Sequence, residues 1–400
     1  MKILLSNKYY YPRGGDCIYT IELEKLLKEK EHEVAVFSMQ HASNLSSEYS
    51  GYFPSEIDFK KKNLNNFLNS FIRPFGSPEV RRNFIRLIND FKPDILHLNN
   101  IHSQISPVIA RIAHKRKIPV VWTLHDYKLL CPRYDCIRDG KSCELCFSRK
   151  INVVRYICLK NSLVASLLAY IEAVFWNRNK IVSFTNLFIC PSLFMSNNMI
   201  KGGFKSEQFI TLSNFINFKK LNGIPNAKGN YYCYVGRLSS EKGVETLLKA
   251  AIELPHYVLK IIGTGPLEQK LKEKYMRRHI EFLGYKNWDE LKPILEGSKC
   301  MVIPSEWYEN NPLSVLESLC LGTPVIGAKI GGIPELINPG INGLLFESGN
   351  VNDLKNQIVH LWEKSSDYTK SSIAENAREK FSSESYYNQL IRIYNNLIAF

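Results

Sequence analysis

Short apolar segments alternate along this chain with longer amphipathic ones, and this alternation constrains the fold more than any other feature. Four apolar runs, at residues 2–6, 33–38, 94–98 and 118–124, each indicate a buried strand. Between the first two runs, residues 16–30 carry an apolar stripe with charges on the opposite face, as expected for a crossover helix. A strand, a helix and a second strand in succession predict a parallel sheet covered by helices.

The same alternation starts again in the second half of the chain. Its apolar runs lie at residues 231–236, 257–262, 280–283, 299–303 and 324–326, and helix-length segments separate them. Residues 218–230, FKKLNGIPNAKGN, have the composition of a linker. The 400 residues are enough for two cores. We therefore predict an α/β protein with two Rossmann-like domains, residues 1–215 and 216–382, and a terminal helix, 383–400, that packs back on the first domain through its apolar face.

The balance of charge indicates which partners to expect. The chain has 52 Lys and Arg against 38 Asp and Glu, a formal net charge of +14, which favours anionic partners such as nucleotides or phospholipid surfaces. We do not expect nucleic acid to be a partner, because the basic residues are spread along the chain and no nucleic-acid-binding module is recognised. The apolar runs at residues 3–5 and 162–176 are too short for a signal peptide and a membrane span, so we expect a cytoplasmic protein.

Two glycine-containing turns follow predicted strands. Gly14 and Gly15 precede the first helix, where free backbone amides can receive a phosphate. Gly263, Thr264 and Gly265 end a strand of the second series, at the carboxyl edge where open α/β sheets bind ligands. An ordinary tight turn explains either sequence equally well. The GxGxxG dinucleotide fingerprint is missing, which weakens the case for a nicotinamide cofactor.

Two cations bracket a loop at the start of the second series. Arg237 and Lys242 flank the turn before a helix predicted to begin near Gly243, so both can reach one anion. The planar fork of Arg and the mobile point charge of Lys suit a diphosphate whose charge grows as it leaves. A charged loop that is only solvated is the other interpretation.

The segment PSEWYENNPLSVLESLCLGTPVIG carries two glutamates in different settings. Glu309 precedes a helix predicted to begin near Pro312, where it can contact a sugar or the reacting centre. Glu317 lies eight positions later, within that helix, where it can accept hydrogen bonds from ribose hydroxyls. The backbone around Asn311, Pro312 and Leu313 would face the donor. Without further context, two glutamates at this spacing are also common on solvated helices.

Together these residues resemble the retaining glycosyltransferases of family 4, which have the GT-B fold. The resemblance covers nearly the whole chain and rests on motifs in the expected order: Gly14-Gly15, His125-Asp126, the Arg237 and Lys242 pair, Glu309 with Glu317, GGIPE at 331–335 and NGLLF at 342–346. It implies two parallel sheets that face a central cleft with the donor site in it.

The resemblance also implies roles for individual residues. Arg237 and Lys242 would neutralise the donor diphosphate, Gly14 and Gly15 would pack on it, and Glu317 would hold the ribose. Glu309 would lie beside the donor sugar, and His125 would face the transferred sugar and support the transition state. Family members retain the anomeric configuration, and the leaving phosphate helps to deprotonate the acceptor, so no enzyme nucleophile is required. No cofactor is expected at the donor site, because the two cations supply the charge of a divalent ion.

A cysteine-rich loop, residues 131–146, follows His125. Its four thiols, Cys131, Cys136, Cys143 and Cys146, can form a tetrahedral zinc site, and Cys158 can replace one of them. The first pair is spaced by four residues rather than two, so this is not the usual zinc ribbon. Structural zinc, unligated thiols and a redox pair remain three interpretations.

Residues 149–180 include the basic residues Lys150, Arg155, Lys160, Arg178 and Lys180 and the apolar residues Leu163, Leu167, Leu168, Ile171, Val174, Phe175 and Trp176. An interfacial helix that contacts the inner face of a membrane has this composition, and a lipid-linked acceptor would explain it. A helix packed in the core of the first domain, with basic ends, is the alternative.

The sequence therefore predicts a hexosyltransferase that moves a sugar from a nucleoside-diphosphate sugar to a glycan or lipid-linked acceptor. We expect it to act in the biosynthesis of a cell-surface polysaccharide such as a capsule, O-antigen or exopolysaccharide. Two alternatives keep the same fold. One is a nucleotide-sugar epimerase, and the other is a non-catalytic protein that binds sugar nucleotides or acts in membrane assembly.

Overall fold

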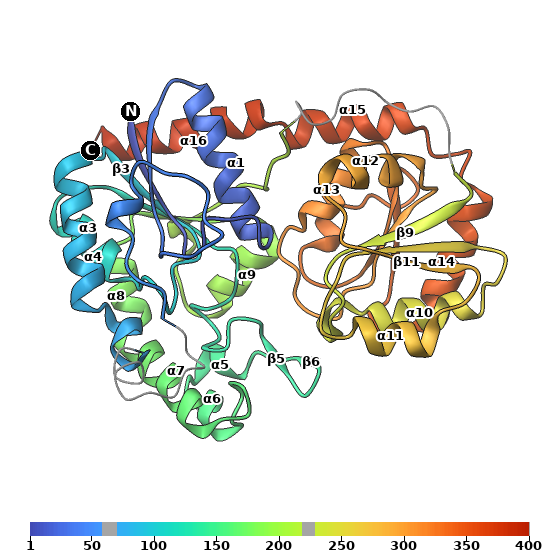
Figure 1. Ribbon diagram of the computed structural model, residues 1–400, viewed down its shortest axis with the longest axis horizontal. Helices are drawn as coiled ribbons and strands as arrows, with labels where there is room; N and C mark the ends of the chain where they lie inside the picture. The colour runs from blue at the N-terminus through green and yellow to red at the C-terminus, as the bar shows by residue number, and fades with distance from the viewer. Residues whose placement is uncertain (58–69, 218–228, 400) are drawn as a thin grey trace. The chain divides into compact units, whose positions relative to one another are not determined.

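The computed structural model describes residues 1–57, 70–217 and 229–399, so most of the predicted linker lies outside the described residues. The chain forms two compact units. The first comprises Met1–Cys136, Cys143–Leu212 and Tyr387–Phe400, and the second comprises Ile137–Ser142 and Ser213–Tyr386. Each unit is built on a sheet with six described strands, covered by helices (Figure 1). The predicted α/β class with two Rossmann-like parallel sheets is confirmed.

The sheet of the first unit has the strand order β2-β1-β3-β4-β7-β8, and every pair of neighbours is parallel. The strands are β1 (Lys2–Ser6), β2 (Glu33–Phe37), β3 (Ile95–Leu98), β4 (Val120–Thr123), β7 (Leu187–Cys190) and β8 (Phe209–Thr211). The first four coincide with the four predicted runs. Their apolar side chains are buried because helices cover the sheet; these are α1 (Gly15–Glu29), α3 (Pro78–Phe91), α4 (Val108–Lys115) and α9 (Leu193–Lys201).

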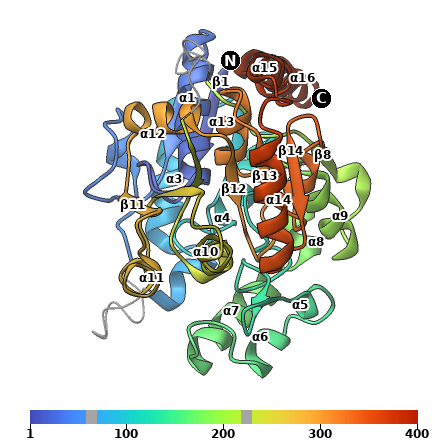
Figure 2. The same ribbon diagram turned by 90° about the vertical axis from the view of Figure 1, so that its right-hand side faces the viewer.

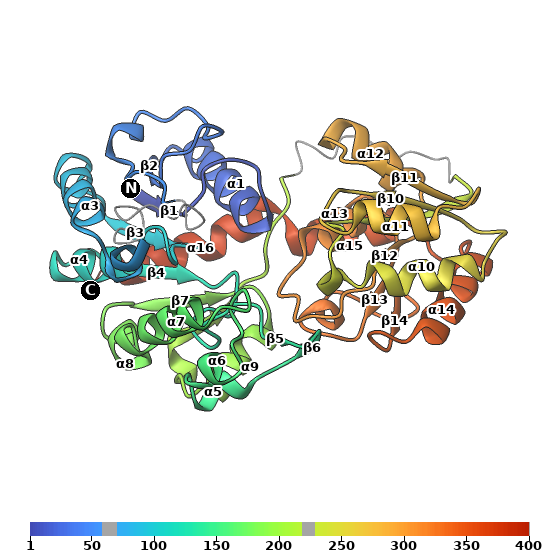
Figure 3. The same ribbon diagram turned by 60° about the horizontal axis from the view of Figure 1, so that its bottom comes forward.

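A helical insertion separates β4 from β7. It begins with the hairpin of β5 (Ile137–Arg138) and β6 (Lys141–Ser142) and continues through α5 (Leu145–Ser148), α6 (Asn152–Arg155), α7 (Leu163–Phe175) and α8 (Arg178–Ser183). Helix α6 packs on both α5 and α7, and the three lie together at one end of the first unit (Figures 1 and 3). The 3₁₀ helix η2 (Arg73–Phe75), which comes well before the insertion in the sequence, also contacts α7. Among the described residues, no helix is long and apolar enough to cross a bilayer.

The last helix, α16 (Ser383–Ile398), contributes to the first unit from Tyr387 onward. Leu390, Ile393 and Tyr394 are buried. The Tyr394 hydroxyl hydrogen bonds to Nδ1 of the buried His97, and the Tyr387 hydroxyl lies 2.9 Å from His32 Nε2. Ile398, which the helical pattern places on the same face, is exposed.

The division between the units falls a few residues from the predicted positions 215 and 383. The segment after Leu212 already belongs to the second unit, because the Asn214 side chain donates to the Asn311 backbone carbonyl at 2.9 Å. The ring of Phe215 packs on that of Tyr386 at 4.6 Å, which keeps the start of α16 with the second unit.

The sheet of the second unit has the order β11-β10-β9-β12-β13-β14, again wholly parallel. Its strands are β9 (Tyr231–Val235), β10 (Val258–Ile262), β11 (Ile280–Gly284), β12 (Met301–Ile303), β13 (Val325–Ala328) and β14 (Gly343–Phe346), of which the last three run side by side in Figure 2. Helix α10 (Val244–Ile252) packs with α11 (Glu268–Tyr275) and α14 (Val351–Glu363), and α13 (Leu313–Cys320) packs with α15 (Lys370–Phe381). Helix α12 (Trp288–Gly297) completes this cover.

Candidate active site

The direction of the strand order reverses once in each sheet, between β1 and β3 and between β9 and β12. Ligands of open α/β sheets bind at such a switch point, beyond the carboxyl ends of the strands. The loops that follow β9, β10 and β12 carry Arg237, Lys242, Gly263–Gly265 and Glu309, and those that follow β1 and β4 carry Gly14, Gly15 and His125. The predicted site residues therefore lie at the ligand-binding edge of the unit to which each belongs.

The turns after β9 and β10 are fixed against each other. Gly263 has a φ of 130°, and a Cβ there would lie 1.9 Å from the Gly236 carbonyl oxygen, so only glycine fits. The Leu238 N–H donates to the Thr264 carbonyl at 3.0 Å, and the Gly236 N–H donates to Ile262 at 3.0 Å. These contacts join the turn after β9 to the turn after β10. The Thr264 side chain is exposed beside the loop that carries Arg237.

Lys242 and Glu309 form an ion pair at this edge. Lys242 Nζ lies 2.7 Å from Glu309 Oε1, and the Lys242 ammonium also lies 4.9 Å from the ring centre of Trp307. Glu309 is buried, whereas a quarter of the Lys242 side chain is exposed. Because part of the Lys242 side chain is exposed, an anionic ligand from solution can still contact its ammonium group while the buried carboxylate holds it.

Several groups keep the Glu309 carboxylate ionised. The Ser305 hydroxyl donates to the same Oε1 at 2.7 Å. Burial raises the pKa of Glu309, but the charge of Lys242 and the hydrogen bonds from Lys242 and Ser305 outweigh it, so the net pKa is lowered. The backbone of Glu309 is held by the GGIPE segment: the Gly332 N–H donates to its carbonyl at 2.7 Å, and a Cβ on Gly331 would lie 2.2 Å from that oxygen.

The other predicted residues of the second unit lie around this pair in different states. Arg237 is exposed and makes no ion pair with any residue that the structure describes. Glu317 lies in α13 and is partly buried. Pro312 precedes that helix and Leu313 begins it, as expected. Asn311 was predicted to face a donor, but its side-chain oxygen accepts from the Asn214 N–H at 3.0 Å, so it has a structural task in addition.

In the first unit, the first turn of α1 carries an acidic residue that the sequence analysis did not single out. Gly14 caps α1, Gly15 begins it, and Asp16 follows. The Asn100 side chain donates to Asp16 Oδ2 at 2.9 Å. Burial raises the pKa of Asp16, but Lys8, His125 and the Asn100 hydrogen bond lower it by more. The net pKa is therefore lowered, and Asp16 stays ionised.

His125 lies next to this carboxylate. Its Nε2 is 2.9 Å from Asn99 Oδ1, and because that oxygen can only accept, His125 donates. The Tyr19 ring packs edge-on against the imidazole at 4.8 Å. Burial lowers the pKa of His125 to about 4, although Asp16 opposes the shift. His125 is therefore neutral at pH 7 and presents a lone pair on Nδ1.

The cysteine-rich loop brings some of its thiols together. Cys131, Cys136 and Cys146 are buried, and the Cys131 sulfur accepts hydrogen bonds from the other two, which lowers its pKa and raises theirs. Cys143 contributes a backbone N–H to the Cys136 carbonyl at 2.7 Å. Among the described residues, no group of three or more His, Cys, Asp and Glu side chains is arranged to hold a metal ion. Structural zinc stays a prediction.

Comparison with known families decides the identity of this architecture. The family model described as Glycosyltransferase Family 4 matches residues 13–220, and the model described as Glycosyl transferases group 1 matches residues 217–380. The chain belongs to glycosyltransferase family 4. This glycosyltransferase has the GT-B fold, and the resemblance that its motifs predicted is confirmed.

Relatives of the glycosyltransferase are distant but match over most of its length. It is 27% identical to an uncharacterised 42.6 kDa protein in the cps region of Klebsiella pneumoniae, over 84% of this chain and 87% of that one. It is also 27% identical to the UDP-Gal:alpha-D-GlcNAc-diphosphoundecaprenol alpha-1,3-galactosyltransferase of Escherichia coli, over 79% and 81%. The crystal structure of Anabaena HepE in complex with UDP superimposes with a TM-score of 0.71 at 19% identity, over 99% of this chain and all of that one.

Sequence reasoning missed two residues that hold His125 in this glycosyltransferase. Asp16 is adjacent to the Gly14-Gly15 pair. An acidic residue in the first turn of a predicted helix was the signal that could have identified it. Asn99 is the first residue after β3, so it lies at the same sheet edge as the end of β4. A polar residue directly after a buried strand was the available signal.

Proposed function

We propose that this glycosyltransferase transfers a hexose-type sugar, with retention of anomeric configuration, from a nucleoside-diphosphate sugar to a glycan or lipid-linked glycan. The observation that carries the proposal is the Lys242–Glu309 pair at the switch point of the second sheet, 2.7 Å between Nζ and Oε1. Ligands of open α/β sheets bind at such a switch point, which supports a diphosphate and its sugar within reach of this cation and this carboxylate.

Donor binding would draw on cations in two different states. Arg237 is exposed and carries no ion pair among the described residues. Its guanidinium can therefore bind a diphosphate without breaking an ion pair within that part of the chain. Lys242 is already oriented by Glu309, so under this proposal its charge would be preorganised for the charge that develops on the leaving group. Glu317, on the next helix, would accept from ribose hydroxyls.

The reaction would need no enzyme nucleophile under this proposal. Glu309 Oε1 already accepts hydrogen bonds from Lys242 and Ser305, so the carboxylate is suited to orient the sugar by hydrogen bonding rather than to attack it. Neutral His125 can accept a hydrogen bond from a sugar hydroxyl through Nδ1, because its Nε2–H donates to Asn99. The departing phosphate oxygen would assist in removing the acceptor proton, as family membership implies.

We propose a role in the biosynthesis of a cell-surface polysaccharide. The Klebsiella relative is described by its place in a cps region, and the Escherichia coli relative is named for galactosyl transfer to a GlcNAc-diphosphoundecaprenol. Both descriptions support an acceptor that is a growing glycan, and the second supports one carried on a lipid diphosphate.

The test is a calorimetric screen of UDP, GDP, ADP and CMP and their sugar conjugates against the wild type and Lys242→Ala. We expect one nucleoside diphosphate to bind selectively, and Lys242→Ala to weaken that binding roughly tenfold or more, because a charge-assisted contact to phosphate is lost. Lys329→Ala is the matched control, since Lys329 forms only a surface ion pair with Glu347.

Equal affinity in the wild type and Lys242→Ala would contradict the donor site. Incubating the selected donor with and without acceptor then separates the alternatives. A transferase consumes donor quickly only with acceptor, whereas an epimerase converts it without one and a non-catalytic binding protein leaves it intact. The anomeric configuration of the product, read by NMR, tests retention.

A further inference from the structure

Helix α7 has its apolar side facing outward. Leu163, Val164, Leu167, Ile171 and Val174, spaced three and four apart along most of the helix, are between 38% and 65% exposed. The side chains that α7 buries are Ser166, Ala169 and Glu172. A helix on the surface of a globular protein normally has the reverse arrangement. The interpretation of this segment as a core-packed helix is therefore wrong.

The buried side of α7 makes specific polar contacts, which determine the orientation of the helix. Glu172 Oε2 lies 2.8 Å from Lys128 Nζ, and both side chains are nearly inaccessible. The Ser166 hydroxyl accepts from the Leu159 N–H at 3.1 Å. Rotating the helix to bury its leucines would expose this ion pair and leave the Leu159 N–H unpaired.

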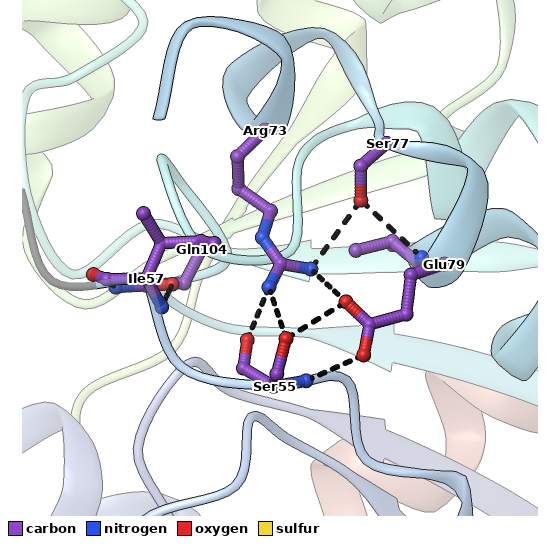
Figure 4. Close-up of polar contacts among 7 residues, drawn as sticks. Ser55, Ile57, Arg73, Ser77, Glu79 and Gln104 are labelled. Carbon is purple, nitrogen blue, oxygen red and sulfur yellow. Dashed lines mark hydrogen bonds and ion pairs between the residues drawn. The ribbon is translucent and has the colours of Figure 1, made fainter. Parts of the chain in front are cut away.

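The apolar surface continues beyond α7 onto η2. Phe175 packs edge-on against Phe75 at 5.2 Å, Phe75 lies 6.1 Å from Phe71, and Phe71 and Ile72 are both more than 40% exposed. The buried Arg73 fixes η2 in place: its guanidinium donates to the Ser55 backbone carbonyl and lies 3.4 Å from Glu79 (Figure 4). We call Phe71, Ile72 and the outward residues of α7 the apolar face.

The charges in the segment that contains α7 are almost all of one sign. Residues 145–183 contain six Lys and Arg and a single acidic residue, Glu172, which is buried and paired. Arg155 and Lys160 are exposed just before α7, and Lys180 is exposed just after it, with its ammonium 4.6 Å from the Phe175 ring. An apolar strip with cations at both ends complements a bilayer surface that contains anionic lipids.

We propose that the apolar face docks the first unit on an anionic membrane, with α7 lying in the plane of the interface. Thirteen residues of helix extend about 20 Å, too short to cross the hydrocarbon core but suited to lie along it. The apolar side chains enter the acyl region, while Arg155, Lys160 and Lys180 contact lipid phosphates. A second copy of this chain is the other occupant that such a face could take, but the flanking cations would then repel each other.

The test measures partition of the purified protein onto phosphatidylcholine vesicles with and without phosphatidylglycerol, by co-sedimentation. We expect binding only to vesicles with phosphatidylglycerol. Leu167→Asp combined with Ile171→Asp should lower the partition coefficient by at least roughly tenfold, since each buried leucine-sized side chain contributes about that factor. Arg155→Glu combined with Lys160→Glu should remove the preference for the anionic lipid.

Matched controls are Ile341→Asp and Lys205→Glu, at exposed positions outside this face. Both should bind vesicles as the wild type does, and all variants should keep the thermal unfolding temperature and the nucleotide affinity of the wild type. Nucleotide affinity therefore distinguishes failure of this inference from failure of the donor site. Absence of vesicle binding by the wild type, equal binding by the aspartate variant, or a dimer that dissociates in that variant would overturn the proposal.

Discussion

At the scale of single residues, the two units hold a buried titratable side chain in opposite states of ionisation. Glu309 stays ionised because Lys242 and Ser305 compensate for its burial. His125 stays neutral because burial outweighs the attraction of Asp16. One site residue therefore presents a fixed negative charge and the other a polar but uncharged ring.

The titration of His125 is a direct check of this difference. We expect its pKa near 4, so the imidazole signals should not shift between pH 8 and pH 5.5. Because the folded pKa lies below the usual value of about 6.5, the unfolded chain takes up the proton first. The contribution of His125 to stability is therefore complete above about pH 6.5 and is lost as the pH falls toward 4.

The measurement is a histidine NMR titration, assigned by comparison with His125→Gln. A midpoint near 6.5 would show that the ring is solvated in the folded protein.

Replacing Glu309 by Gln should affect turnover more than donor affinity. The amide keeps the shape of the side chain but removes the charge beside the sugar, and it leaves Lys242 free to bind the diphosphate. We expect kcat to fall by roughly a hundredfold, as for other lost electrostatic contacts at reacting centres, with the donor Kd changed much less.

Steady-state kinetics and calorimetry on the same preparations measure both quantities. Glu347→Gln removes an equivalent charge from a surface ion pair and is the control. A loss of donor affinity with kcat unchanged in Glu309→Gln would place the carboxylate in ground-state binding instead.

At the scale of elements, the strands were readable from sequence but the outer surface was not. Residues 2–6, 33–38 and 231–236 are strands as predicted, since strands buried on both faces form continuous apolar runs. The strands β7, β8 and β14 were missed; β8 has only three residues, and two of them are exposed. The spacing that identifies α7 as amphipathic is the same whether its apolar side faces the core or the solvent, so only the structure could decide.

The candidate site shows the same limit. The motifs identified Lys242, Glu309 and His125, because each follows a buried strand at a sheet edge. The contacts that each of them makes within its own unit depend on strand order, which the sequence pattern does not specify. The Asn99–His125 hydrogen bond exists because β3 and β4 are neighbours, and Asn311 acquired its structural task from a segment almost a hundred residues away.

The cysteine-rich loop gives a prediction at this scale. We propose that Cys131, Cys136 and Cys146 bind one structural zinc ion together with Cys143 or Cys158. The described side chains form no ready metal site, so the thiols would have to move together to enclose the ion. We expect about one zinc per chain by mass spectrometry, and chelation should lower the unfolding temperature without changing nucleotide affinity.

The variants Cys143→Ser and Cys158→Ser identify the fourth ligand, because only one of them should lower the zinc content. The opposite result would show that the thiols are unligated: the purified protein contains no metal, all its thiols react once it is unfolded, and chelator leaves its unfolding temperature unchanged.

At the scale of the whole molecule, the first unit is assembled from distant parts of the chain. Its last segment, Tyr387–Phe400, buries Leu390, Ile393 and Tyr394 and supplies the hydroxyl that pairs with His97. The second unit is nearly continuous, from Ser213 to Tyr386 apart from the hairpin.

Truncation after Tyr386 should therefore destabilise the first unit selectively. Each lost buried side chain removes about 1.5–3 kcal/mol, and the imidazole of His97 loses a partner. Differential scanning calorimetry should show a transition that moves down by several degrees, beside a second transition that stays in place. A chain that ends at Asn396 keeps the buried residues and should melt as the full chain does; a uniform shift of both transitions would contradict this division.

The pairing of His97 with Tyr394 also sets an order on synthesis at the ribosome. The two residues are 297 positions apart, so the sheet of the first unit is complete long before the helix that closes it has been translated. Most residues of the second unit emerge in between, and its last residue, Tyr386, is made only shortly before Tyr394. During that interval the nascent chain carries an unfinished first unit, and a chaperone that recognises exposed apolar surface would find its target there rather than in the part of the chain made last.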